Sequence, residues 1–277
     1  MVEEKKKNKG EEEKGEMVEE KKTEIVKTKE EETGKSEEKK KAAEEVKEGF
    51  RKQRTGEEKP EDRLARWVPK TKVGKLVKEK KITSIDEILD NYKILEPEIV
   101  DSLLVLKSDL LAIGQAKGKF GGGKRRVWKQ TQKKTAEGNV PTFACMAVVG
   151  DENGHVGIGY GKAKETLPAR EKAIRNAKIN VIKINRACAS FDCSCNEPHT
   201  VPLIVEGKSG SLRMSLMPAP QGTGLVIGDE GKKILKLAGV KDVYSKTFGQ
   251  TRTTINYAKA CMNALEKTKR IKLKNEK

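Results

Sequence analysis

Three cysteines and one histidine lie within the short segment of residues 188–199. Cys188, Cys193, Cys195 and His199 give the spacing C-x4-C-x-C-x3-H. Zn²⁺ binds four thiolate or imidazole ligands in a tetrahedron, and a site closed by four protein ligands is structural because no position stays open for a substrate. The four residues therefore suggest a structural zinc site. The spacing differs from that of paired C-x-x-C knuckles, and a disulfide or a hydrogen-bonded loop histidine are the alternative interpretations.

No enzymatic site can be assembled from the remaining motifs. The chain contains two histidines, His155 and His199, and neither lies near a pair of carboxylates in the sequence. The segment GTGLVIGDEGKK, residues 222–233, lacks the spacing of a phosphate-binding P-loop, and HVGIGYGKAKE, residues 155–165, lacks that of a dinucleotide fingerprint. We therefore expect a protein that is not an enzyme and that requires no cofactor.

The charge of the chain is unevenly distributed. Residues 1–60 contain 18 Lys and Arg and 19 Asp and Glu, whereas residues 61–277 contain 41 and 23, a net charge of +18. Basic side chains near phosphates release condensed counterions, so this excess is typical of a protein that binds nucleic acid. No apolar run approaches the length of a membrane-spanning helix, and the first residues form no apolar leader. We expect a cytoplasmic protein without a membrane partner.

Composition divides the chain into five parts. Residues 1–62 are dominated by Lys, Glu, Gly and Thr, which predicts a disordered charged tail. Residues 63–126 predict a helical arm that ends in a basic, glycine-rich loop. Residues 127–197 and 198–270 predict two compact domains of strands and helices, and residues 271–277 a basic tail.

Two strands joined by a tight turn are predicted for FACMAVV and HVGIGY, residues 143–149 and 155–160. The dipeptide Asn153-Gly154 between them is a strong hairpin signal. Alternate residues of a strand point to opposite faces, so the second strand has one apolar face and one face of bare glycine backbone. Bare backbone permits close approach of the following helix or of RNA. The residues of the bare face are Gly157, Gly159 and Gly161.

The segment after these strands, residues 166–184, predicts a helix with one alanine face and a largely basic remainder that includes Arg175. Strand, strand and basic helix is the order found in double-stranded-RNA-binding domains, which hold RNA by shape and by phosphate contacts. In residues 198–270 the pattern predicts further strands, a glycine-rich loop and two helices. Arg252, at the start of the last helix, is either a phosphate contact or a solvated surface arginine.

Several motifs in a fixed order resemble those of one family. They are VVGDENGHVGIGYGKAKE (148–165) with its basic helix, PHTVP (198–202), LMPAPQGTGL (216–225), LAGVKDVYSKTFGQTRTTIN (237–256) and AKACMNALEKT (258–268). Together they are similar to the universal small-subunit ribosomal protein S5 family. The upstream WVPKTKVGKLVKEKKITSIDEI, residues 67–88, resembles the archaeal type. The resemblance covers about residues 64–270.

The resemblance implies an α+β fold: a double-stranded-RNA-binding-like N-terminal domain, then a two-layer α/β C-terminal domain with a left-handed β-α-β crossover. It implies a structural constituent of the small ribosomal subunit that binds small-subunit ribosomal RNA, contributes to decoding accuracy and lies where messenger RNA enters. The implied neighbours are ribosomal proteins S4 and S8, with S3 near the messenger path. A free double-stranded-RNA-binding factor or a ribosome-assembly factor is the alternative.

The resemblance also supplies candidate RNA-binding residues. The family's RNA-facing loops match the glycines of the second strand with the two lysines after them, and the loop Pro218–Gly224. Family members carry adjacent arginines before the first apolar strand, whereas AEGNVPTF, residues 136–143, has no basic residue. Upstream basic side chains are the candidates to replace them. The predicted RNA-binding residues are Lys124, Arg125, Arg126, Lys133, Lys134, Gly157, Gly159, Gly161, Lys162, Lys164, Arg175, Arg186, Gln221, Gly222 and Arg252.

Overall fold

The computed structural model describes residue 64 and residues 66–116, 125–188, 193, 195 and 197–271. The predicted tail of residues 1–62 lies outside the described residues, as do Lys124 and all but the first residue of the predicted tail 271–277. Residues Arg63–Lys277 form one compact unit. Among the described residues, no helix is both long enough and apolar enough to cross a membrane.

The segment predicted as a helical arm contains three short helices: α3 (Lys72–Lys78), α4 (Ile85–Asn91) and α5 (Pro97–Leu103). Pro97 occupies the first position of α5, where its missing N–H costs no helical hydrogen bond. The arm has no core of its own. Its buried residues, among them Ile88 and Ile99, join one hydrophobic cluster with the alanines of α6 (Thr166–Ile179).

The first sheet is built around the long strand β3 (Gly138–Gly150). The order of the strands is β1-β3-β4-β5, with β1 at Lys107–Leu111, β4 at His155–Ala163 and β5 at Val181–Lys183. A fifth strand, β2 (Lys129–Thr135), pairs with the first half of β3. The predicted hairpin between β3 and β4 is confirmed, and Gly154 in its turn has a φ of 110°. β1 and β2 were not predicted. β1 lies in the segment predicted as a helical arm. β2 lies inside the predicted domain 127–197, but it was not recognised as a strand because it is exposed along its whole length and has no apolar alternation.

The second sheet has the order β6-β7-β9-β8. Its strands are β6 (Val205–Ser209), β7 (Leu212–Pro218), β8 (Leu225–Val226) and β9 (Val243–Phe248), with α7 (Asp229–Leu237) and α8 (Thr254–Thr268). β8 and β9 are parallel and are joined through α7, so the expected β-α-β unit is present. The left-handedness of its crossover stays a prediction.

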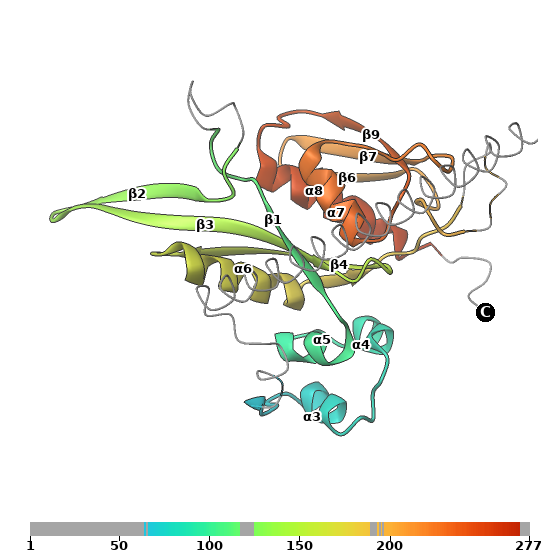
Figure 1. Cartoon of the computed structure of the whole chain (residues 1–277), viewed down its shortest axis with the longest axis horizontal. Coiled ribbons are helices and arrows are strands. Elements are labelled where there is room, and N and C mark those ends of the chain that lie inside the picture. The colour runs from blue at the N-terminus through green and yellow to red at the C-terminus, as the bar shows by residue number, and fades with distance from the viewer. Residues whose placement is uncertain are drawn as a thin grey trace, which may run out of the picture. The chain divides into compact units, whose positions relative to one another are not determined.

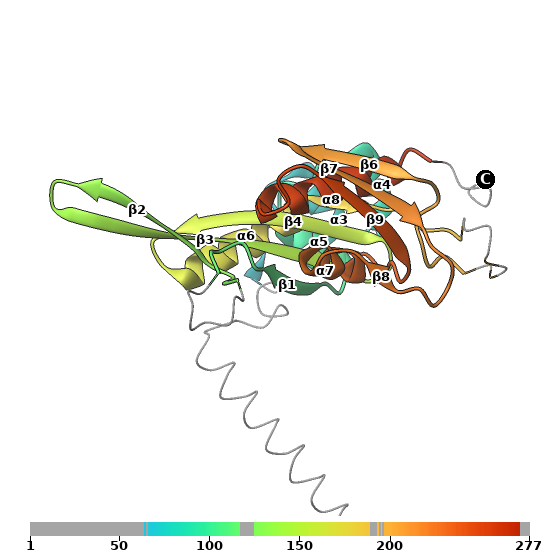
Figure 2. The ribbon, with the colours of Figure 1, turned by 90° about the horizontal axis from the view of Figure 1, so that it is seen from above.

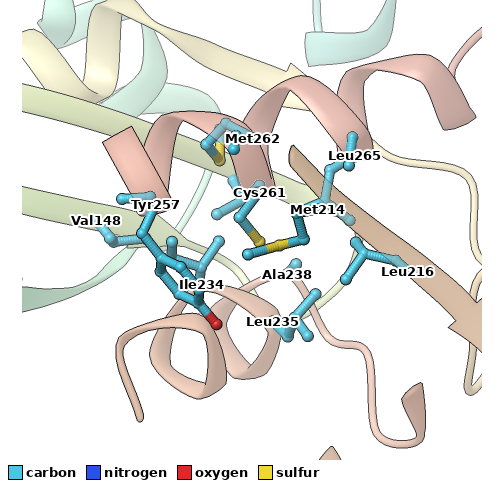
Figure 3. Close-up of a cluster of buried hydrophobic side chains, with 14 of the residues drawn as sticks. Val148, Met214, Leu216, Ile234, Leu235, Ala238, Tyr257, Cys261, Met262 and Leu265 are labelled. Atoms are coloured by element: carbon cyan, nitrogen blue, oxygen red, sulfur yellow. The ribbon is translucent and has the colours of Figure 1, made fainter. Parts of the chain in front are cut away.

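The two sheets share a hydrophobic core. Val148 of β3 belongs to the same buried cluster as Met214 of β7, Ile234 of α7 and Cys261 of α8 (Figure 3). The first sheet is thus covered by α6 on one face and, over part of its other face, by the second sheet with its helices (Figures 1 and 2). The α+β fold class is confirmed. The domain boundary between residues 197 and 198 stays a prediction.

Candidate RNA-binding surface and metal centre

α6 covers the glycine face of β4. Gly157, Gly159 and Gly161 are all buried, and a Cβ atom built on any of the three would stand 2.2 Å from a carbonyl oxygen of α6. The expected close approach of the helix is therefore confirmed. The helix backbone occupies the space in front of these three glycines, and their contact with RNA stays a prediction.

The opposite face of this sheet carries lysines. Lys162 of β4 is paired with Ala144 of β3, which is paired on its other side with Lys129 of β2. Directly paired residues point to the same face of a sheet, and so do alternate residues of one strand. Lys133 therefore lies on the same face as Lys129 and Lys162, whereas Lys134 points to the side of α6. We call this surface the lysine face; its polar residues are Lys129, Thr131, Lys133, Thr142, Tyr160 and Lys162, and it also includes the exposed Val140 opposite Lys133 and the buried Ala144.

The lysine face contains no carboxylate, and nearly all of it is exposed. All seven residues of β2 are exposed, and Tyr160 retains 40% of its accessible surface. Across the strands, the hydroxyl groups of Thr131 and Thr142 are 2.8 Å apart and form a hydrogen bond. Both views of the fold show β2 and the adjacent half of β3 extending beyond α6 as a two-stranded ribbon (Figures 1 and 2). Because such a ribbon buries little apolar surface, it is marginally stable without a partner.

Arg125 and Arg252 lie far apart in the sequence and close together in the structure. Nη1 of Arg125 donates a hydrogen bond of 3.1 Å to the backbone oxygen of Arg252. Both residues are exposed, as are Arg126 beside them and Lys164 after β4. The sequence identified these residues singly and gave no indication that the first two are neighbours.

Two predicted RNA-binding arginines are engaged within the protein to different degrees. Nη1 of Arg186 donates to the backbone oxygens of Glu152 and Gly239, at 3.2 and 3.0 Å, and burial lowers the pKa of its guanidinium. Arg186 therefore holds two turns together, and its contact with RNA stays a prediction. Arg175 keeps 65% of its side chain exposed, and its Nη2 is 3.9 Å from Oε1 of Glu98. It remains available at the surface.

The loop Pro218–Gly224 connects β7 to β8. Gln221 and Gly222 are its exposed residues, as expected of a contact loop. Gly222 and Gly224 have φ angles of 90° and 73°, in the left-handed region that favours glycine. Glycine is therefore needed in this loop because of the backbone conformation of its turns. In β4 glycine is needed because the helix α6 packs so closely.

The four residues of the Cys/His motif converge. The sulfurs of Cys188, Cys193 and Cys195 and a ring nitrogen of His199 all lie within 4.8 Å of one another. Tetrahedral zinc with metal–sulfur bonds of about 2.3 Å separates neighbouring sulfur ligands by about 3.8 Å. Cys195 and Cys188 are 3.5 Å apart, and Cys193 is 3.6 Å from Nε2 of His199, whereas the sulfurs of Cys193 and Cys195 are only 2.9 Å apart and would have to separate to bind one ion. The cluster therefore has the composition and nearly the spacing of a metal site, and all the cysteines here are free thiols.

His199 is fixed by a carboxylate that the sequence did not identify. Its Nδ1 lies 2.8 Å from Oδ2 of Asp242, and the two side chains retain 1% and 6% of their accessible surface. A carboxylate accepts hydrogen bonds, so Nδ1 carries the proton and the Nε2 lone pair faces the thiols. Metal-bound histidines commonly have such a carboxylate partner, which fixes the tautomer and the ring orientation.

Hydrogen bonding makes one thiol of the cluster acidic. The thiol of Cys195, followed by the backbone amides of Cys195 and Gln221, lowers the pKa of Cys193 to about 6. The hydrogen bond to Cys193 in turn raises the pKa of Cys195 to about 11. One thiolate therefore forms readily at neutral pH, and thiolate is the form that binds metal.

Cys193, His199 and Asp242 also have the order of a nucleophile, a base and an orienting acid. That interpretation uses one thiol and leaves Cys188 and Cys195 without a role. A metal site uses all three thiols and the histidine, and it also explains the buried Asp242. The arrangement therefore favours a closed metal site over a catalytic one.

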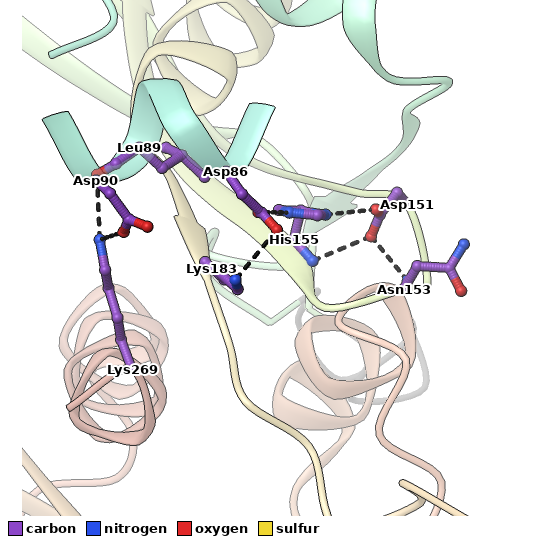
Figure 4. Close-up of polar contacts among 8 residues, drawn as sticks. All are labelled: Asp86, Leu89, Asp90, Asp151, Asn153, His155, Lys183 and Lys269. Atoms are coloured by element: carbon purple, nitrogen blue, oxygen red, sulfur yellow. Dashed lines mark hydrogen bonds and ion pairs between the residues drawn. The ribbon is translucent and has the colours of Figure 1, made fainter. Parts of the chain in front are cut away.

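The second histidine lies in a separate charge network that joins the arm to the first sheet (Figure 4). Nδ1 of His155 is 2.6 Å from Oδ2 of Asp151, and Nε2 is 2.9 Å from Oδ1 of Asp86 in α4. Burial is the largest effect on the imidazole and disfavours its charge, but the two carboxylates together outweigh it and raise the pKa of His155. Nζ of Lys183 binds the other oxygen of Asp86, at 3.1 Å. This network holds α4 against β4 and β5.

The chain matches known proteins along most of its folded part. A family model described as "Ribosomal protein S5, N-terminal domain" matches residues 124–185, and "Ribosomal protein S5, C-terminal domain" matches residues 207–277. "Small ribosomal subunit protein uS5" of Nanoarchaeum equitans is 50% identical over 212 residues, which are 76% of this chain and 91% of that protein. The protein of the same name from Staphylothermus marinus is 50% identical over 207 residues, 74% of this chain and 90% of that protein. The chain therefore belongs to the archaeal type of the ribosomal protein S5 family and is a structural protein of the small ribosomal subunit.

Proposed function

We propose that the lysine face is the surface by which this chain binds small-subunit ribosomal RNA. The observation that carries the proposal is a projecting ribbon whose outer face offers lysines, hydroxyl groups and an exposed tyrosine but no carboxylate. Lysines neutralise phosphates, and Tyr160 can stack on a base or donate to a backbone oxygen. Because the ribbon has no core, RNA on this face would supply the stabilising partner that the ribbon lacks.

Further residues extend the proposed RNA contact beyond the lysine face. Lys134 lies on the other side of the same ribbon, and Lys164 follows β4 at its end. The loop Pro218–Gly224 provides a separate contact through its exposed residues Gln221 and Gly222. The proposed residues outside the lysine face are Arg125, Arg126, Lys134, Lys164, Arg175, Gln221, Gly222 and Arg252, together with Lys124 outside the described part of the chain.

The family resemblance supports a more specific role. On this basis the chain contacts ribosomal proteins S4 and S8, with S3 near the path of the messenger RNA, in cytoplasmic ribosomes. Through these contacts it contributes to decoding accuracy and to the region where messenger RNA enters. None of this requires catalysis by the chain itself.

The metal cluster is proposed to hold one structural zinc ion. Cys188, Cys193, Cys195 and His199 are its ligands, and Asp242 is the outer carboxylate that orients the histidine. A zinc ion at this site closes the loop between the strands β5 and β6. Zinc measured by plasma mass spectrometry in the purified chain tests this directly: about one ion per chain is expected, and much less than one would remove the site.

A free RNA-binding or ribosome-assembly factor is the second candidate, favoured by the order β3, β4 and α6, which resembles that of double-stranded-RNA-binding domains. Sedimentation separates the two. A structural component stays on small subunits in stoichiometric amount at moderate salt, whereas a factor is washed off. Absence of the chain from salt-washed subunits would favour the factor.

The proposed RNA-binding surface is tested by charge reversal at Lys133 and Lys162. The double variant K133E/K162E should bind small-subunit ribosomal RNA more weakly, and the slope of log affinity against log salt should fall by about one for each phosphate that a lysine no longer neutralises. The double variant K259E/K267E, an equal change at two exposed positions of α8, is the matched control. Equal incorporation of the double variant and the wild type into subunits would overturn the assignment of this face.

A further inference from the structure

Two backbone amides of the loop Pro218–Gly224 are held by residues beside the metal cluster. The amide of Ala219 donates to Oγ1 of Thr200, at 3.3 Å, and Thr200 directly follows His199. The amide of Gly224 donates to Oδ1 of Asp242, at 2.8 Å. Each end of the loop is thus held by a residue that adjoins the ligand His199 or is hydrogen-bonded to it.

The second sheet also holds both ends of the loop: Pro218 is the last residue of β7, and the oxygen of Gly224 accepts from the amide of Val243, at 3.2 Å. Within it, the amide of Thr223 donates to the oxygen of Pro220, at 3.3 Å. Cβ atoms built on Gly222 and Gly224 would meet no atom within 4 Å, so no neighbour packs against these turns. Both glycines also have positive φ angles, and a loop without fixed contacts would also adopt other backbone conformations. The exposed turn at Gln221 and Gly222 is therefore held by few contacts, and the hydrogen bond from Gly224 to Asp242 is one of them.

Asp242 connects the loop to the cluster through both of its oxygens. Oδ2 accepts from His199 and Oδ1 accepts from the amide of Gly224, each at 2.8 Å, in a residue that is 4% exposed. Only a carboxylate accepts at both atoms. An asparagine has one acceptor and one donor, so it would keep only one of the two hydrogen bonds in either orientation.

We propose that zinc at the Cys/His cluster sets the conformation of the loop Pro218–Gly224, and that Asp242 is the positioning residue that couples metal to loop. This inference rests on the proposed zinc site and deepens it: the ion prepares the second RNA contact of the chain. With zinc bound, the ring of His199 is held at Nε2 by the metal and at Nδ1 by Asp242, so the acceptor for Gly224 is held as well. Without zinc, the ring and Asp242 keep only their hydrogen bond to each other, and the acceptor for Gly224 is held less firmly.

Amide hydrogen exchange of the full chain, followed by mass spectrometry with and without zinc, tests the inference. Removal of zinc by a chelator should speed exchange in residues 218–224 on the order of tenfold or more, as expected when hydrogen bonds are broken. Exchange in β3 and β4 around Val148 should stay the same, because this core lies among other side chains. Addition of zinc alone should restore the protection of the loop.

The possible outcomes separate the proposals. Stoichiometric zinc together with unchanged exchange in residues 218–224 overturns the coupling and leaves the zinc site in place. A chain that binds no zinc overturns both. Normal zinc content and a zinc-protected loop, combined with no binding to ribosomal RNA, would support the coupling and contradict only the proposed RNA contact.

A variant isolates the role of Asp242. Asp242→Asn should lower zinc affinity by about 10- to 100-fold, as is typical when an outer-shell partner is removed. At saturating zinc it should still show faster exchange at residues 218–224 than the wild type. Asp109→Asn, at an exposed position of β1, is the control and should change neither the zinc affinity nor the exchange of the loop. Equal zinc affinity and equal loop exchange in D242N and wild type would contradict the coupling, and the zinc-removal experiment decides the question if D242N does not fold.

Discussion

Gly159 of β4 lies directly against the backbone of Ala173 in α6: a Cβ atom built on Gly159 would stand 2.2 Å from the Ala173 carbonyl oxygen. The glycines two residues before and after make the same contact with other alanines of the helix. Strand and helix can approach this closely because one contributes glycine and the other alanine. This contact covers one face of the sheet and leaves the lysine face open.

Replacement of Gly159 by alanine should destabilise the chain, because the added methyl group meets backbone that cannot move alone. We expect a decrease of about 1–3 kcal/mol in the free energy of unfolding, measured by urea denaturation. Lys162→Ala, at an exposed position of the same strand, should change it by no more than about 0.5 kcal/mol. Equal stability of G159A and wild type would contradict the packing described for β4.

Two ion pairs between α5 and α6 should differ in strength. Nζ of Lys178 and Oδ1 of Asp101 are 2.7 Å apart, and both side chains retain only 16% of their surface. Asp101→Ala should lower the free energy of unfolding by about 1.5–3 kcal/mol, because Lys178 is left partly buried without its partner. Arg175→Ala removes the exposed, longer pair with Glu98 and should cost less than about 1 kcal/mol. Similar decreases for the two variants would show that burial does not decide the strength here.

His155 should make stability depend on pH. Its pKa is raised in the folded chain, so its contribution is complete below the ordinary histidine value and is lost as pH rises through the folded value. The pKa values of its partners Asp86 and Asp151 are lowered, so their contribution is lost only in acid. His155→Gln should therefore destabilise the chain more at pH 6 than at pH 8.5. Urea unfolding of the wild type and the variant at both pH values checks this. If the variant loses the same free energy of unfolding at pH 6 and at pH 8.5, a charged His155 is contradicted.

Alkylation should divide the cysteines into two groups. Burial raises the pKa of Cys145 to about 11 and that of Cys261 to about 12, and both side chains are fully buried. At pH 8 no more than about a thousandth of either thiol is ionised, so both should resist iodoacetamide in the native chain. Cys193 should react quickly after zinc removal and slowly with zinc bound. Mass spectrometry of the labelled peptides locates the sites, and rapid labelling of Cys261 in the native chain would contradict the buried core.

Local patterns in the sequence predicted the elements that depend on neighbouring residues. The Asn153-Gly154 turn, the alternating glycines of β4 and the alanine face of α6 each follow from short spacings, and all are present. The Cys/His cluster was also predicted from spacing, and its four ligand atoms do converge. The family resemblance then correctly indicated the fold class.

Features that join distant segments were not accessible in the same way. Asp242 is 43 positions from His199, and no local spacing connects them. β2 was missed because a strand exposed on both faces shows no hydrophobic alternation. The sequence also gave no indication that Arg186 lies between two turns, because that position depends on hydrogen bonds to the backbone of Glu152 and Gly239.

Crosslinking in purified small subunits tests the central claim most directly. Ultraviolet irradiation, followed by mass spectrometry of peptides that carry a nucleotide, identifies the residues in contact with ribosomal RNA. Crosslinks are expected on the ribbon and the end of β4, at peptides that contain Lys133, Tyr160 or Lys162. Subunits in which this chain is present but crosslinks only through other surfaces, with the lysine face unmarked, would contradict the account.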